Sequence, residues 1–183
     1  MYQTYRVIDV SDIRQVPDSQ EVFVYTDSDS FLSIEVLERV PRDDDSDAVK
    51  YHFNALAEDN DAINSTITSI QPFKSSNVVA PLAVAGLNEA TGSIIMNTPN
   101  TEAGDMLPHI ILEGRQEVRK FNQPDAVEVE ILMALFRIRS HDADVVVSAS
   151  IPNNAARSIG IKEDFYVLVS SFRIHDYGLF GSH

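Results

Sequence analysis

The sequence has no cysteine among its 183 residues, and it has few basic ones. The first absence excludes disulfide bonds, thiol catalysis and metal sites built from thiolates. Lys and Arg number 14 against 28 Asp and Glu, which gives a net charge of −14. Because duplex binding depends on Lys and Arg that neutralise phosphates, we expect no nucleic-acid partner. No apolar run approaches the roughly 18 residues of a membrane span, so we expect no membrane partner either.

The start of the chain, from Met1 to Arg6, lacks the basic residues and apolar stretch of a signal peptide. The length fits one domain, because domains most often have about 100–150 residues. With 44% hydrophobic residues, nine Phe and six Tyr, the chain can bury a sizeable core. We therefore expect a single, monomeric, intracellular domain over residues 1–183.

The negative charge is concentrated in the first third of the chain. Residues 1–61 carry 15 acidic and 5 basic side chains, whereas residues 62–183 carry 13 and 9. An electropositive partner would therefore be drawn to the first third. Much of the excess lies at Asp27 and Asp29 and in the run from Asp43 to Asp47, and such runs are typical of solvated loops.

Apolar and β-branched runs bounded by turn residues predict strands along much of the chain. These runs lie at residues 21–25, 62–73, 110–118, 127–138 and 145–151, with weaker signals at 78–87 and 92–96. The short link from Arg139 to Asp144 allows only antiparallel pairing of the strands it joins, because a parallel crossover needs about a dozen residues or more. Residues 131–136 are almost continuously apolar, which indicates a central strand buried on both faces.

Apolar residues at helical spacing predict three helices. The first lies in residues 31–40 and ends before Pro41, because proline supplies no amide hydrogen and disfavours helical geometry before it. The second covers about residues 47–58, and the third opens at Lys162. This order of elements predicts an α/β sandwich of the α+β class, in which a mostly antiparallel sheet is flanked by helices on both faces.

One short motif suggests catalysis. Asp27 and Asp29 follow an apolar strand, which resembles the nucleophile motif of the haloacid dehalogenases and gives a magnesium-dependent phosphatase using Asp27 as an alternative function. That family needs a parallel sheet and a downstream lysine in a matching context, so a turn that caps the next helix explains these residues better. The five histidines form no HxxxH or HExxH pair, and phosphate-loop and serine-elbow motifs are absent. We therefore expect no catalytic residues, no cofactor and no metal.

The most informative segment runs from Ile8 to Phe23, a polar loop followed by the start of a strand. Pro17 stiffens the loop and holds Asp18 and Glu21 three residues apart. Carboxylates fixed in this way lose little entropy on docking, which suits recognition of Lys or Arg on a partner. On spacing alone, an equally good interpretation is structural, with Asp18 in a turn and Glu21 at the start of the strand.

The same segment resembles the signature of the Ran guanine-nucleotide release factors, the MOG nuclear-import family, whose pattern IDVSDLR-VPD-QEVF recurs here nearly unchanged. The similarity continues in order along almost the whole chain. Further matches are Tyr51-His52-Phe53, Ser69-Ile70-Gln71-Pro72, Gly114-Arg115-Gln116, Lys120-Phe121-Asn122, Ala143 to Pro152, and Phe172 to Gly181. Several short motifs in the right order are far more specific than any one of them.

The resemblance implies a fold like that of the photosystem PsbP protein. It also implies binding to the small GTPase Ran, promotion of nucleotide release, a role in nuclear protein import, and a location in nucleus and cytoplasm. In the family the acidic residues of the VPD-QEV motif belong to the Ran-binding surface, which carries over to Asp18 and Glu21. Neighbouring candidates for this surface are Asp9, Asp12, Arg14 and Gln20. The alternative is a trafficking adaptor on the same fold.

Two segments depart from the family pattern. Family members begin with a Leu-Phe-Gly-Gly-Ala strand, which is absent here. A missing edge strand would leave its neighbour unpaired, so we expect either that Tyr2 to Val7 replaces it or that the chain is truncated. Residues 85–107 form an insertion loop relative to shorter relatives, and we assign it no function.

Overall fold

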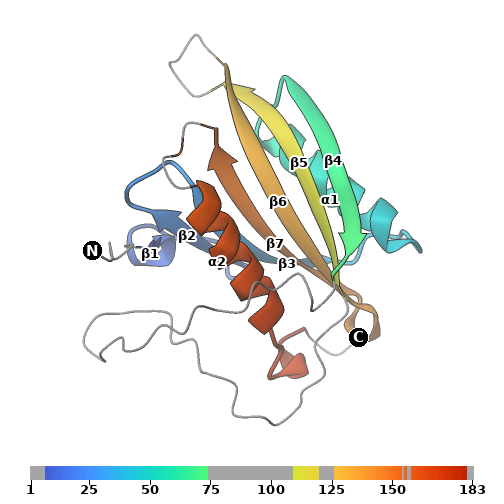
Figure 1. The fold of residues 1–183 in the computed structure, drawn as a ribbon. Helices are drawn as coiled ribbons and strands as arrows, with labels where there is room; N and C mark the ends of the chain where they lie inside the picture. Colours follow the sequence, from blue (N-terminus) through green and yellow to red (C-terminus); the bar gives the residue numbers. More distant parts are fainter. Residues whose placement is uncertain (1–6, 74–108, 120–125, 154, 156–157, 181–183) are drawn as a thin grey trace.

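The computed structural model describes residues 7–73, 109–119, 126–153, 155 and 158–180. These residues form a seven-stranded antiparallel sheet with the strand order β1-β2-β3-β7-β6-β5-β4 (Figure 1). Helix α1 (Asp45–Asp59) lies on one face of the sheet and helix α2 (Ser158–Ser171) on the other. The prediction of an antiparallel sheet flanked by helices on both faces is confirmed.

The strands predicted at 62–73, 110–118, 127–138 and 145–151 are present, and the last two form the predicted antiparallel hairpin. The strands are β1 (Val7–Asp9), β2 (Gln20–Tyr25), β3 (Phe31–Glu38), β4 (Asn64–Pro72), β5 (His109–Arg119), β6 (Ala126–Ile138) and β7 (Ala143–Pro152). Single-turn 3-10 helices are η1 (Val10–Asp12), η3 (Arg139–His141) and η4 (Tyr177–Phe180). The predicted helices at 47–58 and from Lys162 correspond to α1 and α2.

The helix predicted over residues 31–40 is wrong, because these residues form strand β3, which pairs with β2 on one edge and β7 on the other. Leu32 and Ile34 pack beneath α2, whereas Phe31 and Ser33 face the α1 side. Pairing on both edges outweighs the helical spacing of the apolar residues. The preceding residues, Asp27 included, form the β2–β3 turn and do not cap a helix.

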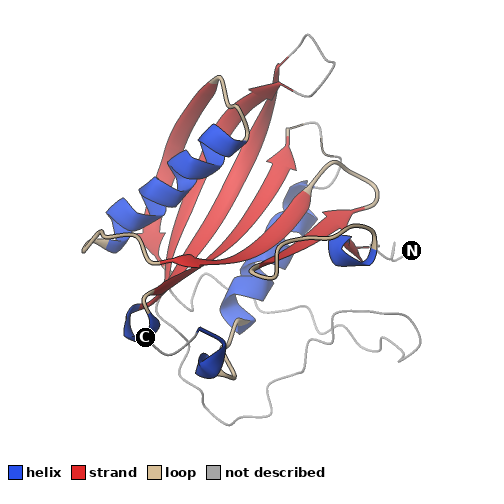
Figure 2. Ribbon diagram, turned by 180° about the vertical axis from the view of Figure 1, so that it is seen from behind, coloured by secondary structure: helices blue, strands red, loops and turns tan. Residues whose placement is uncertain are grey.

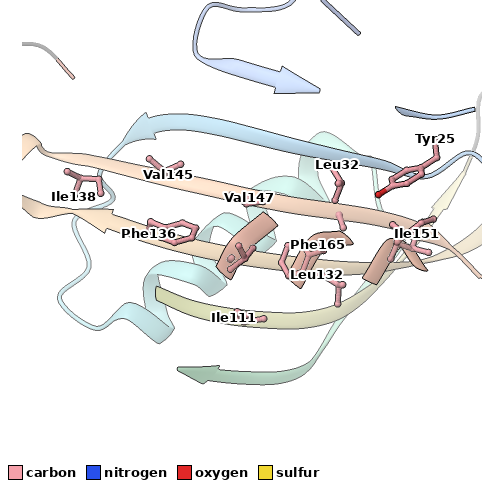
Figure 3. Close-up of a cluster of buried hydrophobic side chains, with 14 of the residues drawn as sticks. Tyr25, Leu32, Ile111, Leu132, Phe136, Ile138, Val145, Val147, Ile151 and Phe165 are labelled. Atoms are coloured by element: carbon pink, nitrogen blue, oxygen red, sulfur yellow. The ribbon is translucent and has the colours of Figure 1, made fainter. Parts of the chain in front are cut away.

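The larger core lies between α2 and the centre of the sheet (Figure 3). Phe165 and Val169 of α2 are fully buried against side chains such as Phe136 and Val147 from β6 and β7. Every residue of β7 and all of residues 131–136 are buried, which confirms the predicted central strand. Burying a side chain such as Phe165 contributes about 1.5–3 kcal/mol.

Polar bonds fix the position of α2 over this core. The Tyr25 hydroxyl donates to Asp164 at 2.8 Å, and the Tyr166 hydroxyl donates to Glu113 at 2.8 Å. Burial raises the pKa of Asp164 above its ordinary value, and burial together with Glu113 raises the pKa of Tyr166. The first bond joins α2 to β2 and the second joins it to β5. Because the two strands are different, α2 can form both bonds in only one orientation.

Helix α1 contacts β4, β5 and β6 on the opposite face, and two of the family matches explain how. Phe53 lies directly over Gly114, where an added Cβ would come within 2.7 Å of its ring and 2.9 Å of the Thr66 carbonyl oxygen. Buried Gln116 donates to the Phe53 carbonyl at 3.4 Å and accepts from the Asn60 amide at 2.8 Å. Gly114 and Gln116 therefore attach α1 to the sheet.

Several expectations lie outside the described residues. These are the strands at 78–87 and 92–96, the insertion loop at 85–107, the match at Lys120-Phe121-Asn122, and most of the segment from Tyr2 to Val7. Within the described part, β1 provides an edge strand by pairing antiparallel with β2, with Val7 opposite Tyr25.

We expect Gly114→Ala to lower the free energy of unfolding by about 1–3 kcal/mol, because the new methyl group overpacks the contact with Phe53. Urea unfolding followed by circular dichroism measures the loss. Combining Gly114→Ala with Phe53→Leu should destabilise the protein less than the sum of the two single changes, because the smaller side chain makes room. Additive losses would contradict the contact.

Candidate functional site

The acidic segment between β1 and β2 is shaped by its own hydrogen bonds. Asp9 caps η1, because its Oδ1 accepts from the amide and the hydroxyl of Ser11 at 2.8 and 2.7 Å. The amides of Ile13 and Arg14 then both donate to the Val10 carbonyl at 3.0 Å. Asp9 therefore shapes the loop.

A second turn carries Asp18. The Gln20 amide donates to the Pro17 carbonyl at 2.9 Å, and the Val36 amide of β3 donates to the Ser19 carbonyl at 2.8 Å. Asp18 is exposed, and its side chain forms no hydrogen bond or ion pair with the described residues. The backbone of the turn is thus tied to the sheet while the carboxylate stays available. Asp12, in η1, is exposed as well.

Gln20 and Glu21 begin β2, and their side chains lie on opposite faces of the sheet because successive strand residues alternate. Gln20 is on the α1 side, where its Nε2 donates to Glu35 at 3.3 Å. Glu21 shares the α2 side with Phe23 and is exposed. The predicted site residues therefore surround the start of β2 and do not form one flat patch.

On the α1 side, a groove of about 920 Å³ lies beside the helix. Helix α1 covers β4, β5 and β6, whereas no α-helix of the described residues covers β2 and β3 on that side (Figure 2). The groove therefore lies between α1, the loop after β1, and the uncovered strands. Its apolar lining includes Val10, Val22, Val24, Phe31, Leu37, Leu56, Met133 and Val146, of which Met133 and Val146 are buried.

Polar groups line the same groove, and two of the predicted residues, Arg14 and Gln20, are among them. In the floor, the hydroxyls of Ser33 and Ser148 are hydrogen-bonded to each other at 2.8 Å. The remaining charged residues of the lining are Glu35, Glu38, Arg39 and Asp59, and His52 is charged only if it is protonated. Glu38 has the strand phase of Leu32 and Ile34, so its side chain points to the α2 side. Arg39 is already paired with Asp142 at 2.7 Å.

Sequence reasoning missed a buried polar centre at one end of this groove. Asp144 of β7 is fully buried and accepts hydrogen bonds from His52 at 2.9 Å, Arg137 at 3.1 Å and the Val40 amide at 3.1 Å. Burial acts to raise the pKa of Asp144, but these hydrogen bonds and the charge of Arg137 outweigh it. The pKa therefore lies below its ordinary value.

Arg137 extends this polar centre to the connection between β3 and α1. Its Nη2 donates to the Val40 carbonyl at 2.8 Å, and its Nη1 donates to the Arg42 carbonyl and to Asp45. The polar centre therefore fastens the start of α1 to β6 and β7. In the sequence, its only signal is that His52 and Asp144 each lie within a family match.

The geometry offers surfaces for binding and gives no support to the catalytic alternative. Asp27 lies in a turn between antiparallel strands, whereas the phosphatase motif needs a parallel sheet. Within the described ranges, no group of three or more His, Asp or Glu side chains is placed to hold a metal ion. Of the helices in those ranges, none is long and apolar enough to cross a membrane.

Comparisons with known proteins extend the resemblance. The model of the family described as "Ran-interacting Mog1 protein" matches residues 4–152. Proteins named Ran guanine nucleotide release factor from Bos taurus and Homo sapiens are each 30% identical over 184 residues, which cover 95% of this chain and 87% of theirs. The crystal structure of the Saccharomyces cerevisiae Ran-binding protein Mog1p superposes with a TM-score of 0.64 at 22% identity, covering 96% of this chain and 89% of that one. That likeness shows the same fold.

We expect Asp144→Asn to lower the free energy of unfolding by about 3–5 kcal/mol at neutral pH, because Arg137 is left buried without its carboxylate. The pKa of Asp144 is lowered by folding, so its stabilisation is complete above the unfolded value of 3.8 and is lost as pH falls through the folded value. In urea unfolding, the difference between the two proteins should stay constant down to about pH 5 and shrink below about pH 4.

Asp142→Asn is the matched control for this prediction. Asp142 is exposed and its ion pair with Arg39 lies at the surface, so we expect a loss of only about 0–1 kcal/mol. Asn also tolerates the positive φ of 50° at this position. Equal losses for the two variants would contradict the assignment of the buried polar centre.

Proposed function

The chain belongs to the Mog1 family, and from this membership we propose that it binds the small GTPase Ran and promotes release of its guanine nucleotide. Relatives named Ran guanine nucleotide release factor support the release activity. Relatives named nuclear import protein support a role in nuclear import, and we propose from that role that the protein is present in nucleus and cytoplasm. We propose a single monomeric domain that regulates a GTPase and catalyses no reaction of its own.

The observation that supports a binding surface is the pair of exposed carboxylates at the start of β2. The side chains of Asp18 and Glu21 form no hydrogen bonds or ion pairs with the described residues, while the turn between them is bonded to β3. A surface that is already ordered loses little entropy on docking. Asp12, Arg14 and Gln20 extend this proposed surface, and Asp9 contributes by shaping the loop.

Release follows if the protein binds nucleotide-free Ran more tightly than loaded Ran. By linkage, the protein and the nucleotide then lower each other's affinity by the same factor. A GTPase of this class holds its phosphates with a lysine, backbone amides and Mg²⁺, so the site is electropositive once it is empty. In this proposal Asp18 and Glu21 pair with basic side chains near that site and stabilise the empty state.

We expect Asp18→Ala combined with Glu21→Lys to weaken binding to nucleotide-free Ran by at least about 30-fold. Truncating one partner of a desolvated charge pair costs about 2–5 kcal/mol, and 2 kcal/mol corresponds to that factor. Calorimetric titration measures binding, and loss of fluorescent nucleotide from Ran measures release. The control is Asp43→Ala combined with Glu58→Lys, which makes the same charge change at exposed positions elsewhere in the first third.

The outcomes separate the alternatives. A folded Asp18/Glu21 variant that binds Ran and releases nucleotide as the unchanged protein does would contradict the site assignment. Binding of Ran without faster release by the unchanged protein would favour a trafficking adaptor. Hydrolysis of a phosphate ester with Mg²⁺, lost in Asp27→Asn, would revive the phosphatase alternative.

A further inference from the structure

We propose that the groove beside α1 binds a segment of the GTPase that carries an apolar side chain next to a Lys or Arg. This inference rests on the proposed binding of Ran. It extends the contact surface from the Asp18 turn onto the α1 side of the sheet, where Asp18 and Glu21 do not reach. The groove is then the part of the surface that selects a particular segment of the partner.

The apolar half of this recognition comes from the floor and walls of the groove. Val22, Val24 and Phe31 line it from β2 and β3, and Leu37 lines it with 36% of its surface exposed. The groove has a volume of about 920 Å³ and is open to solvent, so it can admit side chains of a docked segment.

The charged half comes from carboxylates of α1 and β3. Asp59 on α1 lines the groove and forms no ion pair with the residues that the structure describes. Glu35 on β3 is the second carboxylate, and it accepts hydrogen bonds from Gln20 and Ser33 at 3.3 Å. Excess negative charge in a cleft with apolar walls attracts a cation and repels phosphate-bearing ligands.

Basic groups in the lining do not cancel this charge. Arg39 is neutralised by Asp142 at 2.7 Å, and His52 is buried against Asp144 at 2.9 Å. Arg14 is therefore the one basic side chain of the described lining that has no acidic partner, against the two carboxylates of Glu35 and Asp59. The lining as a whole fits a segment that brings its own Lys or Arg.

The groove is continuous with the segment that carries Asp18. Arg14 and Gln20 line the groove, and they lie on either side of Asp18 in the chain. One partner can therefore rest on the Asp18 turn and place a neighbouring segment in the groove. If one partner contacts both the Asp18 turn and the groove, the predicted site residues can bind it together although they lie on different sides of β2.

Two variants with matched controls test the inference by calorimetric titration on nucleotide-free Ran. Asp59→Lys reverses a groove carboxylate, and Glu58→Lys makes the same charge change at the adjacent exposed residue outside the lining. Leu37→Lys places a charge in the apolar part, and Ile63→Lys does so at an exposed apolar residue elsewhere. We expect each groove variant to weaken binding at least about tenfold and each control less than about twofold.

A second measurement uses the unchanged protein, so that it does not depend on the folding of a variant. Leu37 lines the groove and is partly exposed, so its methyl groups are open to contact with an occupant. We expect the ¹³C-methyl resonances of Leu37, assigned with Leu37→Ile, to shift when Ran is added. A resonance that stays in place on a complex shown to form would overturn the inference.

Failure of this inference can be told from failure of the proposed function. If the unchanged protein does not bind Ran, both fail. If it binds Ran and releases nucleotide while the groove variants match their controls, the groove inference is wrong and the proposed function stands. Weakened binding by both groove variants, with unchanged unfolding transitions and intact controls, supports it.

Discussion

The carboxylate of Asp144 holds together parts of the chain that are far apart in sequence. It joins β7 to the Arg137 side chain of β6, to His52 of α1 and to the Val40 amide in the connection between β3 and α1. Buried ion pairs of this kind often add little net stability over an apolar core, but they admit few alternative arrangements. Here the arrangement they fix is the placement of α1 across the sheet. Where α1 lies determines which strands it leaves uncovered, and so determines the groove.

The two faces of the sheet are consequently covered to different extents. On the α2 side, apolar packing is supplemented by hydroxyl–carboxylate bonds, and the centre of the sheet is closed. On the α1 side, the helix is attached at Gly114 and Gln116 over one half, and the other half is open to solvent. Strand β7 runs between these regions with every residue buried. One face is closed by α2 over the centre of the sheet, and the other carries the groove beside α1.

Much of this architecture could be predicted from local patterns, because a strand buried on both faces is recognisable as a continuous apolar run. The segment 31–40 could not, because its apolar spacing suits a helix and only pairing with the distant β7 makes it a strand. The sequence predicted which segment carries the candidate site, but not how its residues are arranged in space. Assigning Gln20 and Glu21 to opposite faces requires knowing which residues of β2 face α1. Predicting the groove requires knowing where α1 lies on the sheet. The hydrogen bonds of Asp144 to His52 and Val40 join residues that are 92 and 104 positions apart in the sequence. Patterns of residue spacing within a helix or strand cannot predict contacts over such separations.

The groove draws nearly all of its lining from residues 10–60, whereas the cluster beneath α2 draws mostly on residues 111–180. The proposed recognition surface therefore shares its stretch of chain with buried core residues such as Val49 and Phe53. Exposed groove residues such as Leu37 and Asp59 contribute little to the free energy of unfolding, since surface substitutions usually change it by less than about 0.5 kcal/mol. Substitutions confined to such exposed positions can therefore alter the groove while the buried residues beside them keep the fold.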